Sequence, residues 1–200
     1  HDALPISGVV VIAGTGSIAF GRNASGEEAR AGGWVYVFGD EGGGFWLGSR
    51  GLTRSLAVRD GRDKAPELLN IFADELRAFD LLSSKNGTAA TSLAISCAQK
   101  VLEANVQSTK QIVADGAMHL ANTVVSAWTK VGSINEPFKL TISGGLSKNE
   151  NYRNLILGNI KSLGAKVELV EAVGDNLDGA IWIALNQKEN IAPMLGWARA

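Results

Sequence analysis

The chain has 200 residues, of which 46% are hydrophobic, and this is enough for one well-packed core. Its 19 basic and 20 acidic residues give a formal net charge of −1, so the positive surface that nucleic-acid binding requires is not expected. No apolar run approaches the ~20 residues of a membrane-spanning helix. The single cysteine, Cys97, excludes an internal disulfide framework and favours a reducing compartment, so we expect a cytoplasmic globular protein.

The hydrophobic pattern predicts three strands first, then four helices, and then strand and helix in alternation. The expected strands are short and rich in apolar or β-branched residues, and they span Val9–Ala13, Ile18–Arg22, Glu27–Ala31, Phe138–Ser143 and Lys166–Val170. The expected helices have apolar residues three or four positions apart, and they span Phe45–Arg59, 66–79, Ser92–Ala104, Thr109–Val131, 147–163 and a last segment that begins at Asp175. This order predicts an α/β fold with a mixed five-stranded sheet and helices on its faces.

Two helix starts carry the spacing of a capping box, in which a hydroxyl residue is followed three positions later by Glu or Gln. Ser108 with Gln111 predicts the start of the long fourth helix, and Ser147 with Glu150 predicts the start of the helix after the fourth strand. The stretch Leu81–Thr91 is polar and contains glycine, so we expect it to connect two helices.

A glycine-rich turn separates the first two predicted strands, and its residues are Gly14, Thr15, Gly16 and Ser17. Glycines permit positive φ and close backbone approach, so the amides and the two hydroxyls of this turn can contact phosphate oxygens. No Gly-Lys-Ser/Thr follows and no helix begins there, so it is not a Walker loop. The alternative is an ordinary hairpin turn.

A second glycine turn follows the fourth predicted strand, with the residues Ser143, Gly144 and Gly145. A larger side chain at this place would block a flat adenosine, and the start of a helix favours an anion. We therefore expect this turn to contact the nucleotide, and a tight strand–helix turn is the alternative.

A third motif lies between the two glycine turns, with Gly33, Trp34, Asp40 and Glu41 as candidate ligands of a sugar. A carboxylate can accept hydrogen bonds from two adjacent sugar hydroxyls, and an indole can cover an apolar sugar face. The alternatives are that the two acidic residues only favour the start of the helix from Phe45, and that the indole belongs to the core.

Taken together, the three motifs resemble the nucleotide-binding lobe of the N-acetylglucosamine kinase-like group within the BadF/BadG/BcrA/BcrD ATPase family, which belongs to the actin/hexokinase/Hsp70 superfamily. The resemblance implies an actin-like (ribonuclease H-like) fold, ATP and Mg²⁺ as cofactors, and the turn at 14–17 as the second phosphate loop. It also implies that Gly33 and Asp40 contact an amino sugar. Val35 stands where the family usually has Gly, and Gly43 stands where Ser is common, which leaves the shape of this loop open.

The resemblance also implies how the chain is organised. Residues 8–187 match the C-terminal lobe of a two-lobed kinase, and residues 188–200 are expected to be a tail. Residues 1–7, HDALPIS, resemble the translation of a sequencing adaptor, and we expect them to be a foreign leader. The family's catalytic Asp is expected in the missing N-terminal lobe, so no catalytic residue is assigned here, and the family suggests a homodimer.

These inferences predict ATP-dependent phosphoryl transfer to an amino sugar, either N-acetylglucosamine or glucosamine. They also predict that the chain alone lacks this activity, because the catalytic base belongs to the other lobe. One alternative is an ATPase activator of acyl-CoA reductases or dehydratases, whose iron–sulfur cluster needs more than one thiolate per chain. Another is a nucleotide-binding module without turnover.

Overall fold

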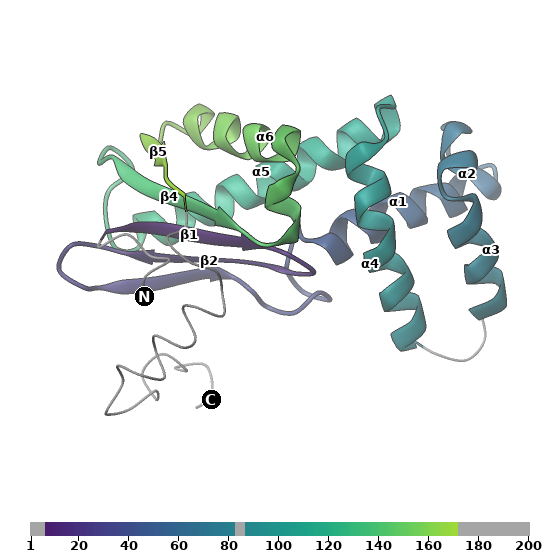
Figure 1. Ribbon diagram of the computed structural model, residues 1–200, viewed down its shortest axis with the longest axis horizontal. Helices are drawn as coiled ribbons and strands as arrows, with labels where there is room; N and C mark the ends of the chain where they lie inside the picture. The colour runs from purple at the N-terminus through teal and green to yellow at the C-terminus, as the bar shows by residue number, and fades with distance from the viewer. Residues whose placement is uncertain (1–6, 83–86, 172–200) are drawn as a thin grey trace.

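The computed structural model describes residues 7–82 and 87–171, and within them one sheet of five strands carries the site (Figure 1). The strands are β1 (Gly8–Ala13), β2 (Ser17–Arg22), β3 (Glu28–Gly32), β4 (Phe138–Ser143) and β5 (Val167–Leu169), in the spatial order β3-β2-β1-β4-β5. The first three pair antiparallel, whereas β1 with β4 and β4 with β5 pair parallel. The predicted mixed α/β sheet is confirmed.

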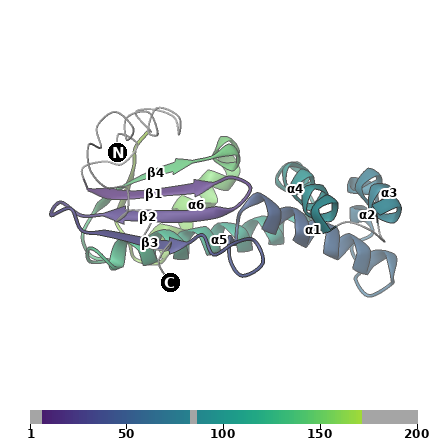
Figure 2. The same cartoon turned by 90° about the horizontal axis from the view of Figure 1, so that it is seen from below.

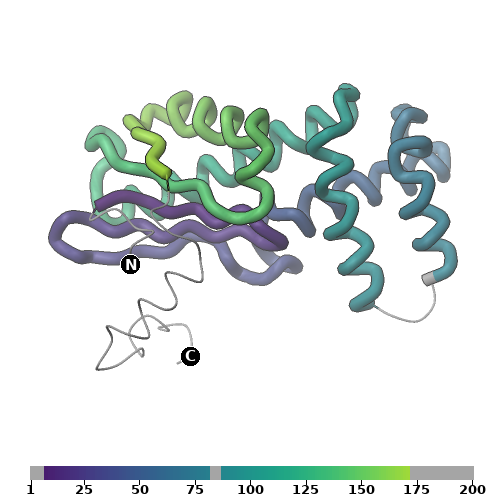
Figure 3. Tube along the Cα trace, viewed as in Figure 1, coloured from purple at the N-terminus to yellow at the C-terminus, as the bar shows by residue number. Residues whose placement is uncertain are grey.

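Two helices lie along one face of the sheet, and the others extend beyond one of its ends (Figures 1 and 2). The covering helices are α5 (Gln107–Thr129) and α6 (Glu150–Ser162), and the 3₁₀ helix η1 (Gly145–Lys148) leads from β4 into α6. The helical group beyond the sheet consists of α1 (Gly44–Arg59), α2 (Glu67–Ile71), α3 (Ala73–Leu82) and α4 (Gly87–Glu103). Figure 3 shows that α1 begins at the sheet and runs into this group.

The core lies between the sheet and α5. Val9 and Val11 of β1 have no exposed surface, and neither have Leu120 and Val124 of α5. Burying an aliphatic side chain of this size contributes ~1.5–3 kcal/mol. The helix approaches β2 so closely that a Cβ on Gly21 would lie 2.7 Å from a backbone carbonyl oxygen of α5. This packing fixes the end of the sheet from which the site is built.

The predicted helix over 66–79 is divided in two. Helix α2 ends at Ile71 and α3 begins at Ala73, while Phe72 between them has φ −106° and ψ 22°. The Phe72 side chain is fully buried against Gly51 of α1, where a Cβ would lie 2.9 Å from the ring atom Cζ. The break directs this ring into the core. The apolar period is the same on both sides of it, so the pattern does not reveal the break.

The predicted connection over Leu81–Thr91 is wrong at both ends, because α3 continues to Leu82 and α4 already begins at Gly87. The Thr91 hydroxyl donates to the Gly87 carbonyl oxygen four positions earlier, at 3.0 Å, as threonine does inside helices. The expected last helix from Asp175, the expected tail at 188–200 and residues 1–6 of the expected leader lie outside the described residues. Within the described residues, no helix is long and apolar enough to cross a membrane.

The first predicted capping box, Ser108 with Gln111, is not formed. Helix α5 begins after Val106, which makes no side-chain cap. The Ser108 hydroxyl instead donates to Glu67 Oε1 of α2 at 2.7 Å, and Gln111 Oε1 accepts from Arg54 of α1 at 3.2 Å. Partners on neighbouring helices have replaced the local hydrogen bonds that the spacing predicts.

The second predicted capping box, Ser147 with Glu150, is not formed either. The Ser147 hydroxyl donates to the Gly144 carbonyl oxygen at 2.7 Å inside the 3₁₀ helix. The N-cap of α6 is Asn149, whose Oδ1 accepts from the backbone amide of Tyr152 at 2.9 Å. The 3₁₀ helix moves the start of α6 two residues beyond the predicted serine, and this shift leaves the asparagine in the capping position.

Candidate functional site

The glycine-rich turn at residues 14–17 is held by the start of α1. Its Gly14 carbonyl oxygen accepts from the Gly44 amide at 2.8 Å, and its Thr15 carbonyl oxygen accepts from the Phe45 amide at 2.9 Å. Within the described part of the chain, the Thr15 and Gly16 amides donate to no backbone carbonyl. The carbonyls of Gly14 and Thr15 therefore face the helix, while the amides of Thr15 and Gly16 stay available to an anion.

The second glycine turn lies beside the first. Strands β1 and β4 are parallel and Ile12 pairs with Ser143, so both turns leave the sheet at the same end. Gly144 has φ +95°, and a Cβ there would lie 2.6 Å from the Ala13 carbonyl carbon and 3.0 Å from the Gly14 nitrogen. Only glycine fits at this position. A Cβ on Gly145, in contrast, would meet nothing within 4 Å, so the surface beside it is open.

Asp40 is carried by the loop between β3 and α1, and its carboxyl lies against the first turn. Its backbone has φ +59°, a conformation that Asp tolerates better than most residues. A Cβ on Gly16 would overlap Asp40 Oδ2 and would lie 2.9 Å from its Cγ. Asp40 Oδ1 is buried, and among the described residues it has no hydrogen-bond partner. An unpaired buried carboxylate oxygen is costly, and a ligand that donates a hydrogen bond would satisfy it.

The environment of Asp40 disfavours its charge. Burial raises the pKa of the Asp40 carboxyl, and the negative charge of Glu41 raises this pKa further. A hydrogen bond from the Ser17 backbone amide acts in the opposite direction. The net result is a raised pKa, which a hydrogen-bond donor placed on the free oxygen would lower again.

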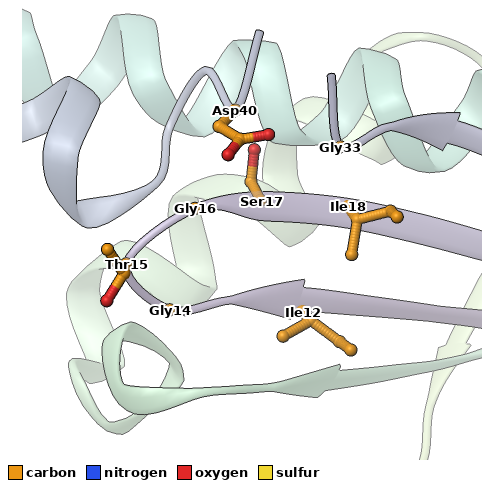
Figure 4. A pocket seen from close by; sticks show the side chains of 8 residues that line it. All are labelled: Ile12, Gly14, Thr15, Gly16, Ser17, Ile18, Gly33 and Asp40. Carbon is orange, nitrogen blue, oxygen red and sulfur yellow. The ribbon is translucent and has the colours of Figure 1, made fainter. Parts of the chain in front are cut away.

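The first turn and Asp40 share one open pocket of about 270 Å³ (Figure 4). The pocket is lined by the four residues of the turn, by Asp40 and by three further residues of the sheet and its edge, which are Ile12, Ile18 and Gly33. Of the predicted residues, it thus brings together Gly14, Thr15, Gly16, Ser17, Gly33 and Asp40.

The other predicted residues lie outside the lining of this pocket. The Trp34 side chain is 61% exposed, and the Arg30 guanidinium stacks over its ring at 4.3 Å from the ring centre. The Glu41 backbone carbonyl accepts from the Ser17 hydroxyl at 2.9 Å, so this hydroxyl is already used within the protein. The turn at 143–145 adjoins the first turn without lining the pocket.

The loop that follows Trp34 is apolar and exposed. Val35, Tyr36, Val37 and Phe38 all have large exposed fractions, and Val35 has φ +74°. This conformation is strained for a β-branched residue and natural for glycine. Val35 therefore replaces the glycine that is usual in the family that the sequence resembles, at a position where glycine would adopt this conformation without strain.

Two pocket residues and one anchor were not predicted from the sequence. Ile12 and Ile18 form a cross-strand pair on the sheet face opposite to Val11, and the alternation along β1 and β2 gives the signal that would have found them. Tyr152 of α6 is fully buried and donates to the Gly42 carbonyl oxygen at 2.7 Å, which fixes the loop that carries Asp40. Nothing local to Tyr152 indicates this partner.

Comparison with known proteins decides the family. The sequence model of the BadF/BadG/BcrA/BcrD ATPase family matches residues 3–185. The chain belongs to this family. Across the described segments of this BadF-type chain, no group of three or more His, Cys, Asp or Glu side chains is placed to hold a metal ion.

Two curated relatives carry sugar-kinase names. The N-acetylmuramic acid/N-acetylglucosamine kinase of Clostridium acetobutylicum is 30% identical over 188 residues, which cover 90% of this chain and 61% of the relative. The N-acetyl-D-glucosamine kinase of Dictyostelium discoideum is 27% identical over 194 residues, which cover 91% of this chain and 60% of the relative. The chain of this BadF-type protein therefore spans less than two thirds of the length of both relatives.

A solved structure shows the same fold. A protein described as an N-acetylglucosamine kinase from Chromobacterium violaceum aligns with a TM-score of 0.69 at 22% identity, over 88% of this chain and 59% of that chain. A second, from Porphyromonas gingivalis and described in the same way, aligns with a TM-score of 0.62 at 17% identity. The predicted actin-like (ribonuclease H-like) fold of this BadF-type chain is confirmed.

Proposed function

We propose that this chain is the nucleotide-binding lobe of an ATP-dependent amino-sugar kinase. In the whole protein, the γ-phosphoryl group of ATP would pass to a hydroxyl of N-acetylglucosamine or a related amino sugar. Family membership and the names of two relatives support this proposal. The cytoplasmic location and the homodimer expected from the sequence remain predictions.

The observation that carries the proposal is the contact between Asp40 and Gly16. It places a carboxylate with one unpaired oxygen beside a turn whose Thr15 and Gly16 amides lack backbone acceptors. The carboxylate suits hydroxyl donors of a sugar, and the amides suit phosphate oxygens. Phosphoryl transfer needs the sugar hydroxyl and the phosphate held side by side, because the reaction depends on positioning and on charge stabilisation.

Two features of the described residues support ATP as the nucleotide. The turn at 14–17 offers amides to the phosphates, and the open surface beside Gly145 offers room for the adenosine. Mg²⁺ would supply neutralising charge to the phosphate oxygens, and it is commonly held by those oxygens and by water rather than by a protein cage. Asp40 would bind and orient the sugar, while the catalytic base would come from the other lobe.

Binding and turnover measured separately test this function. The 200-residue chain should bind ADP in calorimetry and should phosphorylate no sugar by itself. A longer protein that carries this chain together with a first lobe should phosphorylate N-acetylglucosamine. Kinase activity of the chain alone would refute the assignment of the base to the other lobe. A longer protein that binds ADP without turnover would support the module without catalysis.

The activator ATPase is the less favoured alternative. It requires cysteine thiolates for its iron–sulfur cluster. Cys97 is buried in α4, where burial raises the pKa of its thiol to about 12 and its Sγ donates to the Leu93 carbonyl oxygen. A thiol in this environment stays protonated and is a poor ligand. Iron content and visible absorbance of anaerobically purified protein would distinguish the two functions.

A further inference from the structure

The loop that carries Asp40 and the turn at residues 14–17 are joined on two sides. A hydrogen bond from the Ser17 backbone amide lowers the pKa of the Asp40 carboxyl, and the Ser17 hydroxyl donates to the Glu41 carbonyl oxygen at 2.9 Å. On the other side, a Cβ on Gly43 would lie 2.7 Å from the Gly16 carbonyl carbon. The two segments are therefore too closely packed to move independently.

The two oxygens of the Asp40 carboxyl have different surroundings. Oδ2 lies against Gly16, and Oδ1 is buried without a hydrogen-bond partner among the described residues. The positive φ of Asp40 shows that the surrounding structure holds it in a conformation of higher energy. Because this side chain is fixed, a ligand that binds Oδ1 can change how Oδ2 contacts the turn at residues 14–17.

We propose that Asp40 is a positioning residue for the phosphate turn as well as a sugar ligand, so that sugar and nucleotide binding are positively coupled; this inference rests on the proposed function. A sugar hydroxyl that donates to Oδ1 keeps the carboxylate ionised and oriented. The ionised carboxylate then accepts a stronger hydrogen bond from the Ser17 amide and fixes the turn. Coupling between sites is typically ~5- to 150-fold and is reciprocal, so each ligand should tighten binding of the other by the same factor.

The first experiment perturbs the phosphate turn and measures the sugar. Gly16→Ala places a methyl group against the Asp40 carboxyl, so N-acetylglucosamine affinity without nucleotide should fall by ~5-fold or more. Gly158→Ala is the matched control, because it makes the same substitution in α6, where a Cβ would meet nothing within 4 Å. Sugar affinity should be unchanged in this control. Unchanged sugar affinity in Gly16→Ala would overturn the coupling.

The second experiment perturbs Asp40 and measures the nucleotide. Asp40→Asn keeps the shape of the side chain, and asparagine tolerates positive φ, so the fold should be retained. The neutral amide accepts a weaker hydrogen bond from Ser17, and ADP affinity without sugar should fall by ~5-fold or more. Asp74→Asn is the matched control, because it makes the same substitution at an exposed carboxylate of α3 that pairs with Arg77 outside the pocket, and it should leave ADP affinity unchanged. Tighter ADP binding in Asp40→Asn would show that Asp40 only repels the phosphates, and would overturn the proposal.

A measurement without ligand separates failure of this inference from failure of the proposed function. The amide resonance of Ser17 should follow the ionisation of Asp40 in the wild-type chain and in Asp74→Asn, and should lose this response in Asp40→Asn. A chain that shows the response but binds neither ADP nor sugar contradicts the kinase and, with it, the coupling. A chain that binds both ligands with independent affinities and without this response overturns the coupling alone.

Discussion

The phenol of Tyr152 donates a buried hydrogen bond of 2.7 Å to the carbonyl oxygen of Gly42, which lies 110 positions earlier in the chain. Burial raises the pKa of this phenol, so it remains a donor at neutral pH. Gly42 itself has φ +79°, and a Cβ there would lie 2.7 Å from Leu120 Cγ of α5. Helices α5 and α6 thus both contact the loop that carries Asp40 and fix its position.

Tyr152→Phe should therefore destabilise the fold. It removes one donor and leaves the buried Gly42 carbonyl unsatisfied, which typically costs ~1–3 kcal/mol. The free energy of unfolding in urea measures this loss. Tyr36→Phe is the matched control, because the Tyr36 side chain is 44% exposed, and it should change stability by less than ~0.5 kcal/mol. Equal effects of the two substitutions would contradict the role given to Tyr152.

Val35→Gly should stabilise the chain. The left-handed conformation at φ +74° costs a non-glycine residue ~1–2 kcal/mol, which exceeds the ~0.5–1 kcal/mol that glycine loses through the entropy of the unfolded chain. Thermal unfolding should show the gain. Val37→Gly is the control at similar exposure, 62% against 60%, and positive φ is not found at Val37, so this change should be neutral or destabilising. A lower melting temperature for Val35→Gly would argue against the strain.

Replacing a glycine that closely approaches another backbone segment and replacing a glycine in open surroundings should change stability in opposite directions. Gly21→Ala places a methyl group 2.7 Å from the Ala127 carbonyl oxygen, so β2 and α5 must separate, at a cost of ~1–3 kcal/mol. Gly158 lies within α6, where a Cβ would meet nothing within 4 Å. Gly158→Ala should therefore stabilise the chain by ~1 kcal/mol through helix propensity. Urea unfolding of the two variants side by side tests both signs.

The pH dependence of stability should reveal Asp40. The pKa of the folded state is raised above the ordinary 3.8. At pH values between the ordinary and the raised pKa, the folded state therefore binds more protons than the unfolded state. Stability contributed by this group is then present at low pH and is lost as pH rises through the folded pKa. Asp40→Asn removes this loss, so its stability relative to wild type should increase from pH 3 towards pH 7.

Asp63 provides the control of opposite sign. The hydrogen bond from Arg54 Nε, at 2.8 Å, lowers the pKa of the Asp63 carboxyl. Its stabilising effect is therefore present above the ordinary pKa and is lost as pH falls. Asp63→Asn should match wild type in acid and should be less stable at neutral pH. Parallel pH profiles for the Asp40 and Asp63 variants would contradict both assignments.

The sequence predicts the sheet well because its strands carry their own signal. Val9–Ala13 is a continuous apolar run, as expected for a central strand that is buried in the middle of a mixed sheet. The pairing of the two glycine turns also follows from topology, since parallel strands end at the same edge. The Asp40 carboxyl could be predicted as a ligand from its type and its neighbours, although its contact with Gly16 depends on the loop path.

The failures have a common physical cause. Ser108 and Ser147 have the right spacing for local caps, but each hydroxyl has a better partner elsewhere, Glu67 on α2 in one case and Gly144 in the other. The Trp34 ring stacks under Arg30 and does not line the pocket, and its role as a sugar ligand stays a prediction. Each of these outcomes is decided by the position of another segment, which short-range spacing does not encode.

The attachment of the turn at residues 14–17 to the start of α1 has a mechanical consequence. The first amides of this helix bind the carbonyls of Gly14 and Thr15, and its last turn carries Arg59, which pairs with Asp80 of α3 at 2.8 Å. A helix of 16 residues is a stiff rod of ~24 Å. A tilt imposed at this turn, where we propose that the phosphates bind, should therefore be carried to α2 and α3. A fluorophore attached to these helices should respond to events at the opposite end of α1.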